Sequence, residues 1–247
     1  MRLNVSIKML RMRMKESITS KTYDVWSWFY DYTFGALVWQ RQKRAVKQLH
    51  CQKGDRVLDL GVGTGMLLPL YPKDVTVVGI DLSEGMLAKA DKRKGKQGLD
   101  QCLLVQGDAM LPPFADASFD HIVITHVITV VSDPHKLLDW AARLLKPGGR
   151  IVMLNHFQSD NPIVAWFEHV LNPMFIKIGW RSDLAMEDAL RGADVSVLYS
   201  FKMGLIDLWR IVVMTHRRPG DPLVRPISRP AGGLWARWRR HRVATNF

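Results

Sequence analysis

The sequence predicts an α/β fold with a mostly parallel, seven-stranded sheet that is covered by helices on both faces. Three observations lead to this prediction. Short apolar segments rich in β-branched residues alternate with helical segments from residue 56 onward. A glycine-rich turn directly follows the first of these strands. Hydrophobic residues make up 47% of the 247 residues, which is enough for a sizeable core.

The expected elements follow one another at spacings typical of βαβ units. Five segments are expected to form the parallel strands, at residues 56–60, 75–80, 102–106, 119–124 and 150–155. Helices are expected at about 66–70, 83–94 and 134–145, and before the sheet over the aromatic-rich residues 21–50. Ser83 is expected to cap the helix that begins beside it. Two further strands, at 195–202 and 208–215, predict an antiparallel ending.

The net charge of +12 is concentrated at the two ends of the sequence. Lys and Arg exceed Asp and Glu by eight in residues 1–53 and by seven in residues 215–247, so the residues between them carry −3. We therefore expect a basic N-terminal helical cap or membrane-docking segment over 1–53, followed by a core over 54–216 with a cap insertion at about 157–193. The remainder, 217–247, is a basic tail. Such ends attract phosphates, on anionic lipid or on nucleic acid.

The two cysteines, Cys51 and Cys102, are too far apart to form a CxxC pair, so we expect free thiols and no metal site. No apolar stretch has the length of a transmembrane helix, and the basic N-terminus lacks the uninterrupted apolar segment of a signal peptide. These features predict a cytoplasmic location.

A candidate cofactor site lies where the first three strands end. Gly61, Gly63 and Gly65 follow the first strand with the spacing GxGxG, whereas a dinucleotide-binding turn has the spacing GxGxxG. Asp81 ends the second strand, 20 residues after Gly61, where a carboxylate can accept from both hydroxyls of a ribose. Asp108 follows the third strand, where it can accept from the amino group of an adenine.

This combination resembles the class I S-adenosylmethionine (SAM)-dependent methyltransferases, which have a Rossmann-like fold, over about residues 54–155. The resemblance implies SAM as the cofactor and S-adenosylhomocysteine as its product. It places Asp59 near the methionine part of SAM, with Leu82 and Met86 beside the adenosine. The expected cofactor-binding residues are Asp59, Gly61, Val62, Gly63, Thr64, Gly65, Asp81, Leu82, Met86, Asp108 and Ala109.

A narrower resemblance covers nearly all of residues 20–214. The segments that carry it are 23–35 (YDVWSWFYDYTFG), 62–71, 131–134, 154–157 and 166–168. They are similar to the small, peripheral phospholipid N-methyltransferases of bacteria. The resemblance implies successive methylation of phosphatidylethanolamine towards phosphatidylcholine, at the inner face of the cell membrane. Basic ends with Trp and Tyr side chains are suited to an anionic membrane surface, which independently favours this function.

Transfer of a methyl group to an amine needs few catalytic residues, because positioning and desolvation supply most of the acceleration. The ammonium must first lose a proton, so a nearby Tyr or His is a candidate base. The candidates are Tyr23, Tyr30, His126 and His156. By family position, the two tyrosines cover the cofactor and shape the acceptor pocket. His126 lies just past the fourth strand, where the family resemblance predicts an aromatic residue instead.

Other functions are compatible with the same fold. A methyltransferase that acts on a quinone or on an ornithine lipid would use the same cofactor site and would also benefit from basic ends. A nucleic-acid methyltransferase is disfavoured, because no Asn/Asp-Pro-Pro-aromatic motif follows the fourth strand and no RNA-binding module is attached. A SAM-binding scaffold without catalysis is the remaining alternative.

Overall fold

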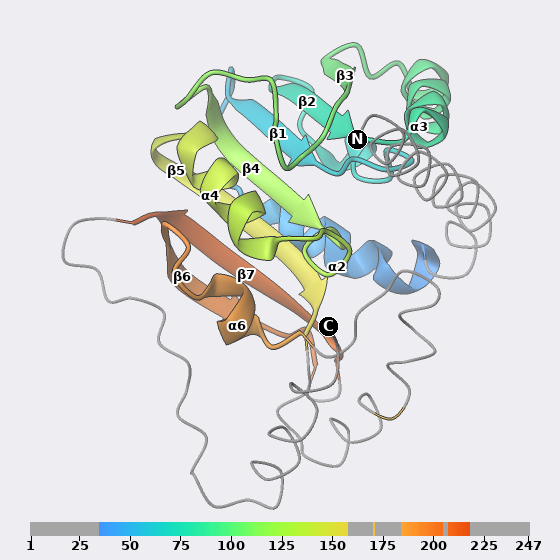
Figure 1. Ribbon diagram of the computed structural model, residues 1–247. Helices are drawn as coiled ribbons and strands as arrows, with labels where there is room; N and C mark the ends of the chain where they lie inside the picture. The colour runs from blue at the N-terminus through green and yellow to red at the C-terminus, as the bar shows by residue number, and fades with distance from the viewer. Residues whose placement is uncertain (1–34, 158–169, 171–183, 205–206, 218–247) are drawn as a thin grey trace, which may run out of the picture.

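The computed structural model describes residues 35–157, 170, 184–204 and 207–217. Its strands are β1 (Arg56–Leu60), β2 (Thr76–Asp81), β3 (Cys102–Gln106), β4 (Phe119–Thr125), β5 (Leu145–His156), β6 (Val195–Phe201) and β7 (Trp209–His216). They form one seven-stranded sheet in the order β3-β2-β1-β4-β5-β7-β6 (Figure 1). The first five strands are parallel, and β7 is antiparallel to both β5 and β6. The predicted sheet with its antiparallel ending is therefore confirmed.

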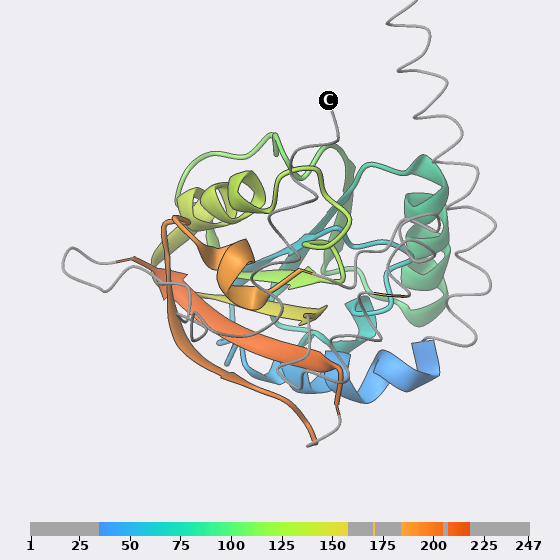
Figure 2. The same cartoon turned by 60° about the horizontal axis from the view of Figure 1, so that its bottom comes forward.

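Helices cover both faces of this sheet. The described helices are α2 (Gly35–Lys47), the short 3-10 helix η2 (Leu68–Leu70), α3 (Glu84–Gln97), α4 (Pro134–Leu144) and α6 (Met186–Leu190). The helices α4 and α6 lie on one face and α2 lies on the other (Figures 1 and 2). None of the described helices is long and apolar enough to cross a membrane.

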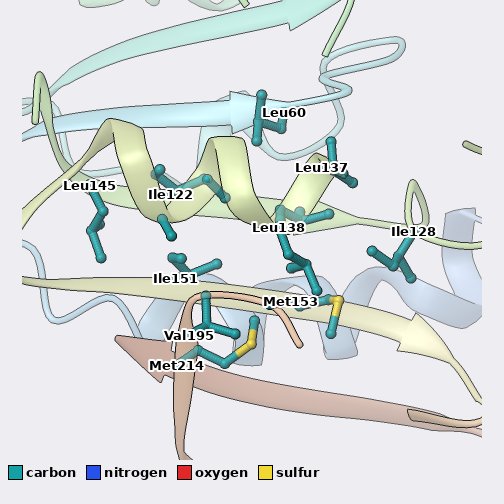
Figure 3. Close-up of a cluster of buried hydrophobic side chains, with 14 of the residues drawn as sticks. Leu60, Ile122, Ile128, Leu137, Leu138, Leu145, Ile151, Met153, Val195 and Met214 are labelled. Carbon is teal, nitrogen blue, oxygen red and sulfur yellow. The ribbon is translucent and has the colours of Figure 1, made fainter. Parts of the chain in front are cut away.

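Two clusters of buried side chains form the core, one on each face of the sheet. Figure 3 shows the cluster beneath α4, in which Leu138 packs among side chains of the central strands, such as Ile122 and Met153. The other cluster joins Val46 of α2 to alternate residues of the same strands, such as Val123. Because successive side chains of a strand point to opposite faces, each central strand contributes to both clusters. Full burial of one such aliphatic side chain contributes roughly 1.5–3 kcal/mol.

Side-chain caps fix the beginning of two helices beside the carboxyl edge of the sheet. The Ser83 hydroxyl accepts from the backbone N–H of Met86 at 3.3 Å, as the sequence predicts. The Asp133 carboxylate accepts from the backbone N–H of Lys136 at 3.1 Å at the beginning of α4. Such caps satisfy N–H groups that have no partner inside the helix.

Two predicted elements differ markedly from the structure. The helix expected at 66–70 is a turn followed by the three-residue helix η2, because Pro69 and Pro72 leave no room for an α-helix of useful length. Strand β5 begins at Leu145 and not at residue 150, since Leu145 already pairs with Phe119. Gly149 is required inside this strand, because a Cβ there would lie 2.3 Å from the backbone oxygen of Asp120.

An ion pair holds α2 beside the carboxyl edge of the sheet. The Arg41 Nε donates to both carboxylate oxygens of Asp207, at 2.9 and 3.0 Å, and its guanidinium lies 4.7 Å from the ring centre of Trp209. Trp209 pairs in register with His156, so the turn between β6 and β7 lies where β5 ends. The helix that follows the N-terminal segment is thereby fastened next to the candidate site.

Several predictions lie outside the described residues. These concern the N-terminal segment up to residue 34, most of the predicted cap (158–169 and 171–183) and the tail 218–247. Both cysteines are free thiols, as expected.

Candidate functional site

The turn after β1 needs its three glycines. Gly61, Gly63 and Gly65 have φ angles of +79°, +54° and +72°, in the left-handed region that other residues rarely adopt. Two of them also lie too close to neighbouring side chains to carry a Cβ. At Gly61 a Cβ would lie 2.3 Å from Cγ2 of Val127, and at Gly65 it would lie 2.7 Å from Cδ1 of Leu68. The predicted GxGxG motif therefore forms a tight turn at the carboxyl end of β1.

The residues between the glycines fasten the turn to its surroundings. Val62 is buried, and its side chain fills the space where a Cβ on Gly79 of β2 would lie. Thr64 is buried as well, and its carbonyl oxygen accepts from Nη1 of Arg93 in α3 at 2.9 Å. The turn is thus held between β2 and α3.

Asp81 joins the end of β2 to this turn. One carboxylate oxygen accepts from the backbone N–H of Gly63 and the other from that of Ser83, both at 2.9 Å. Burial raises the pKa of the Asp81 carboxyl, and the two hydrogen bonds oppose this shift. The side chain predicted from the spacing to bind a ribose thus also determines the position of the glycine turn.

Asp59 is a buried carboxylate near the carboxyl end of β1. The hydroxyl of Tyr71 donates to Oδ2 of Asp59 at 3.0 Å, while Oδ1 is buried and has no hydrogen-bond partner among the described residues. Burial raises the pKa of Asp59 to about 7, and the charge of Asp81 adds to the shift while the Tyr71 bond opposes it. An unpaired oxygen in such a place is unfavourable unless a cation or a donor meets it.

Residues at the ends of β2 and β3 form the adjacent part of the site. Asp108 is exposed, and its Oδ1 accepts from the backbone N–H of Met110 at 2.8 Å, which shapes the loop after β3. Leu82 is 68% exposed, so its side chain is available to a ligand, whereas Met86 and Ala109 are partly buried. Leu82, Asp108 and Ala109 therefore follow the ends of two neighbouring strands, and Met86 lies in the first turn of α3.

The ends of β4 and β5 bring together the two predicted histidines. His126 has a φ of +61°, and its backbone N–H donates to the carbonyl of Leu154 at 2.9 Å. Burial lowers the pKa of both His126 and His156 to about 4, and the charge of His156 lowers that of His126 further. Lys202 contributes to the shift at His156, whose ring lies 6.3 Å from that of Trp209. Both imidazoles are therefore neutral at neutral pH.

Asn155, which directly precedes His156 in β5, is a buried amide that was not predicted as a site residue from the sequence. The Nδ2 of Asn155 donates to the hydroxyl of Thr129 at 3.3 Å and to the backbone oxygen of His156 at 2.8 Å. Its Oδ1 is buried and lacks a partner within the part of the chain that the structure describes. The other two predicted catalytic residues, Tyr23 and Tyr30, lie outside the described residues.

Comparison with known proteins identifies this arrangement. Residues 58–153 match the family described as a methyltransferase domain. A phosphatidylethanolamine N-methyltransferase of Cereibacter sphaeroides is 37% identical over 175 residues, which are 70% of this chain and 85% of that protein. The chain belongs to the class I SAM-dependent methyltransferases.

Other known proteins are similar to parts of this methyltransferase in sequence or in structure. A demethylmenaquinone methyltransferase of Lactobacillus johnsonii is also 37% identical, over 146 residues that cover 57% of this chain and 55% of that protein. The crystal structure of the YcgJ protein of Bacillus subtilis has the same fold, with a TM-score of 0.60 and 19% identity. This similarity covers 72% of this chain and 98% of that one.

SAM is therefore the cofactor of this methyltransferase, as predicted. The described residues fit such a ligand on two observations. At Gly63 a Cβ would meet no atom within 4 Å, so the turn borders open space at the edge where open parallel sheets bind their ligands. The unpaired buried oxygen of Asp59 suits a ligand with a positively charged ammonium and sulfonium. Among the described residues, no group of three His, Cys, Asp or Glu side chains is placed to hold a metal ion.

Proposed function

We propose that this methyltransferase transfers methyl groups from SAM to the amino group of phosphatidylethanolamine, and to its mono- and dimethyl derivatives, towards phosphatidylcholine. The observation that carries the proposal is the 37% identity to a phosphatidylethanolamine N-methyltransferase, which extends over 70% of this chain and 85% of that relative. The similarity to the demethylmenaquinone methyltransferase spans a smaller share, about half of that protein.

In this proposal, residues at or near the ends of the first three strands each bind a different part of SAM. Asp81 accepts from the ribose hydroxyls while it holds the turn through Gly63. Asp59 faces the methionine part of SAM with its unpaired oxygen. Asp108 and Ala109 meet the adenine, which Leu82 and Met86 flank. Val62, Thr64 and the three glycines shape the backbone against which the cofactor lies.

The acceptor amine must be neutral when it attacks. The cofactor supplies a methyl group on a sulfonium, which is already a good leaving group. A primary amine such as that of lysine has a pKa of about 10.4. The pKa values of His126 and His156, about 4, lie far below that of such an amine. We therefore assign these neutral imidazoles to accepting hydrogen bonds from the amine, while water removes its proton.

Asn155, which precedes His156 in β5, is a further buried acceptor at this end of the strand. Its amide nitrogen donates to Thr129 and to the backbone oxygen of His156, which fixes the side chain, and Oδ1 has no hydrogen-bond partner among the described residues. Neutral acceptors of this kind favour a polar N–H donor over an apolar ring. This chemistry supports an amine as the methyl acceptor.

A demethylated menaquinone is the second candidate acceptor. It is supported by the identity of 37% to the Lactobacillus johnsonii protein and by the location of such an acceptor in a membrane. An ornithine lipid is a third possibility, because it also presents an amine at a membrane surface.

A parallel assay distinguishes these acceptors. Full-length protein is incubated with methyl-labelled SAM and with vesicles of phosphatidylcholine that contain phosphatidylethanolamine, an ornithine lipid, a demethylated menaquinone or no addition. We expect label in mono-, di- and trimethylated phosphatidylethanolamine on thin-layer chromatography. Label in the quinone or ornithine-lipid fraction alone would refute phosphatidylethanolamine as the acceptor.

We further propose that the carboxyl edge of the sheet faces an anionic membrane from the cytoplasmic side. Four of the exposed large apolar side chains, apart from Leu82 beside the cofactor, lie in the loops and turns at this edge. They are Leu111, Val130, Met203 and Leu208. The excess positive charge of residues 1–53 and 215–247 complements anionic headgroups. The acceptor would then reach the site without leaving the bilayer surface.

This orientation predicts how the protein binds vesicles. We expect cosedimentation to increase with the fraction of anionic lipid and to decrease with salt, because each basic residue near the surface contributes about 1 kcal/mol at low ionic strength. Leu111→Asp should weaken binding roughly tenfold, since a buried leucine side chain is worth about 1.5–3 kcal/mol. Leu198→Asp, on the outside of β6 with 50% exposure, is the matched control and should have little effect. Equal losses in the two variants would contradict this orientation.

A further inference from the structure

Tyr71, which follows η2, is hydrogen-bonded to Asp59, the protein carboxylate expected beside the cofactor. Tyr71 is the C-cap residue of η2 and is 4% exposed, and its hydroxyl donates to Oδ2 of Asp59 at 3.0 Å. This bond occupies one oxygen of the carboxylate with a neutral donor. The other oxygen, Oδ1, is buried and lacks a partner among the described residues. Oδ2 of Asp59 is therefore hydrogen-bonded, whereas Oδ1 can still meet a ligand.

The ionisable groups around this pair favour its protonated form. Asp81, at the end of β2, raises the pKa of Asp59. Burial, with the charge of Asp59, raises the pKa of Tyr71 well above its ordinary value of 10. Cys51, before β1, and Cys102, at the beginning of β3, also raise the pKa of Tyr71. Tyr71 therefore remains a hydroxyl donor at neutral pH.

We propose that Tyr71 is a positioning residue that holds Oδ2 of Asp59, so that Oδ1 faces the cationic part of SAM and cofactor binding expels the proton that Asp59 carries in the free protein at mildly acidic pH. The inference rests on SAM as the cofactor and is independent of the acceptor. A neutral carboxylic acid in the free protein avoids a bare buried charge, and the cofactor supplies the positive charge that stabilises the ionised form.

The direction of the pH dependence follows from the raised pKa of about 7 for Asp59. Above this pH Asp59 is already ionised, and the affinity for SAM is highest. As the pH falls below it, binding must displace a proton, and the affinity decreases by up to about tenfold per pH unit. The α-amino group of the cofactor stays largely protonated up to its own pKa of about 7.7–8.0. We therefore expect a loss of roughly 25-fold between pH 7.5 and pH 5.5.

Calorimetric titration of the full-length protein with SAM from pH 5.5 to 7.5 tests this proposal. Tyr71→Phe removes the hydrogen bond that lowers the pKa of Asp59. The pH at which affinity is half lost should therefore move upward, so that the variant is impaired more at pH 6.5 than at pH 7.5. A purely structural defect would reduce the affinity by the same factor at each pH. Tyr199→Phe is the matched control, because its exposed hydroxyl bonds to Gln48 away from Asp59, and it should leave the curve unchanged.

Two further measurements make the test decisive. Titrations in buffers of different ionisation enthalpy should show proton release on binding near pH 6.5, and Asp59→Asn should bind weakly with no release. Flat wild-type affinity, an unshifted midpoint in Tyr71→Phe, or wild-type proton release in Asp59→Asn would overturn the proposal. The last result would assign the titration to Asp81, whose pKa burial also raises. None of these results bears on which acceptor is methylated.

Discussion

Replacing Asp81 with alanine is expected to weaken SAM binding by about a hundredfold or more. The substitution removes the acceptor for the ribose hydroxyls together with the two 2.9 Å hydrogen bonds from the backbone N–H groups of Gly63 and Ser83. Hydrogen bonds to a charged group contribute about 1.5–3 kcal/mol each, and about 1.4 kcal/mol corresponds to tenfold in affinity. The glycine turn would lose its attachment to β2 at the same time.

Isothermal titration calorimetry at pH 7.5 measures this effect. Asp81→Asn keeps one acceptor oxygen and should give an intermediate loss. Asp116→Ala removes an exposed acidic side chain whose partner is Arg143, and it should bind SAM as the wild type does. Unchanged affinity in Asp81→Ala, with a wild-type melting temperature, would refute the placement of the ribose.

Gly61→Ala should lower both the stability and the SAM affinity of the protein. A Cβ at this position would lie 2.3 Å from Cγ2 of Val127, and the φ of +79° is strained for any residue with a side chain. Overpacking of this kind typically costs about 1–3 kcal/mol, and a left-handed backbone about 1–2 kcal/mol more. We expect urea denaturation to show a loss of about 2–5 kcal/mol in the free energy of unfolding.

Two variants separate the causes of this loss. Gly98→Ala has a φ of +60° but nothing within 4 Å of its Cβ, so it should cost only the backbone strain. Gly61→Ala combined with Val127→Ala removes the clashing methyl group, since Cβ of Val127 is 3.5 Å away, and should recover part of the SAM affinity. Equal stability losses in Gly61→Ala and Gly98→Ala would show that the approach of Val127 is unimportant.

The parts of the site that the sequence predicted depend on short-range geometry. Gly61, Gly63 and Gly65 form the turn that follows the first strand, and Asp81 ends the next strand, so their spacing alone brings them to one edge of the sheet. The cap at Ser83 is equally local, with its partner three residues away. The prediction was less accurate where prolines interrupt a segment that otherwise has a helical pattern. Two prolines shortened the helix expected at 66–70 to η2.

The parts that could not be predicted are contacts between residues far apart in the sequence. The hydrogen bond from Tyr71 to Asp59 spans 12 residues, and the Arg41–Asp207 pair spans 166. No periodicity or motif encodes such pairs, because they arise from tertiary contacts between separate elements. The neutral state of His126 was likewise inaccessible, since it results from burial beside His156.

Competition between acceptors in one vesicle tests the proposed function most directly. Vesicles that contain phosphatidylethanolamine and a demethylated menaquinone at equal mole fraction are incubated with the protein and a limiting amount of methyl-labelled SAM. The ratio of label in the two products gives the ratio of kcat/KM values. We expect at least tenfold more label in N-methylated phosphatidylethanolamine, roughly 1.4 kcal/mol of discrimination. A majority of the label in the methylated quinone would contradict the assignment of an amine as the acceptor.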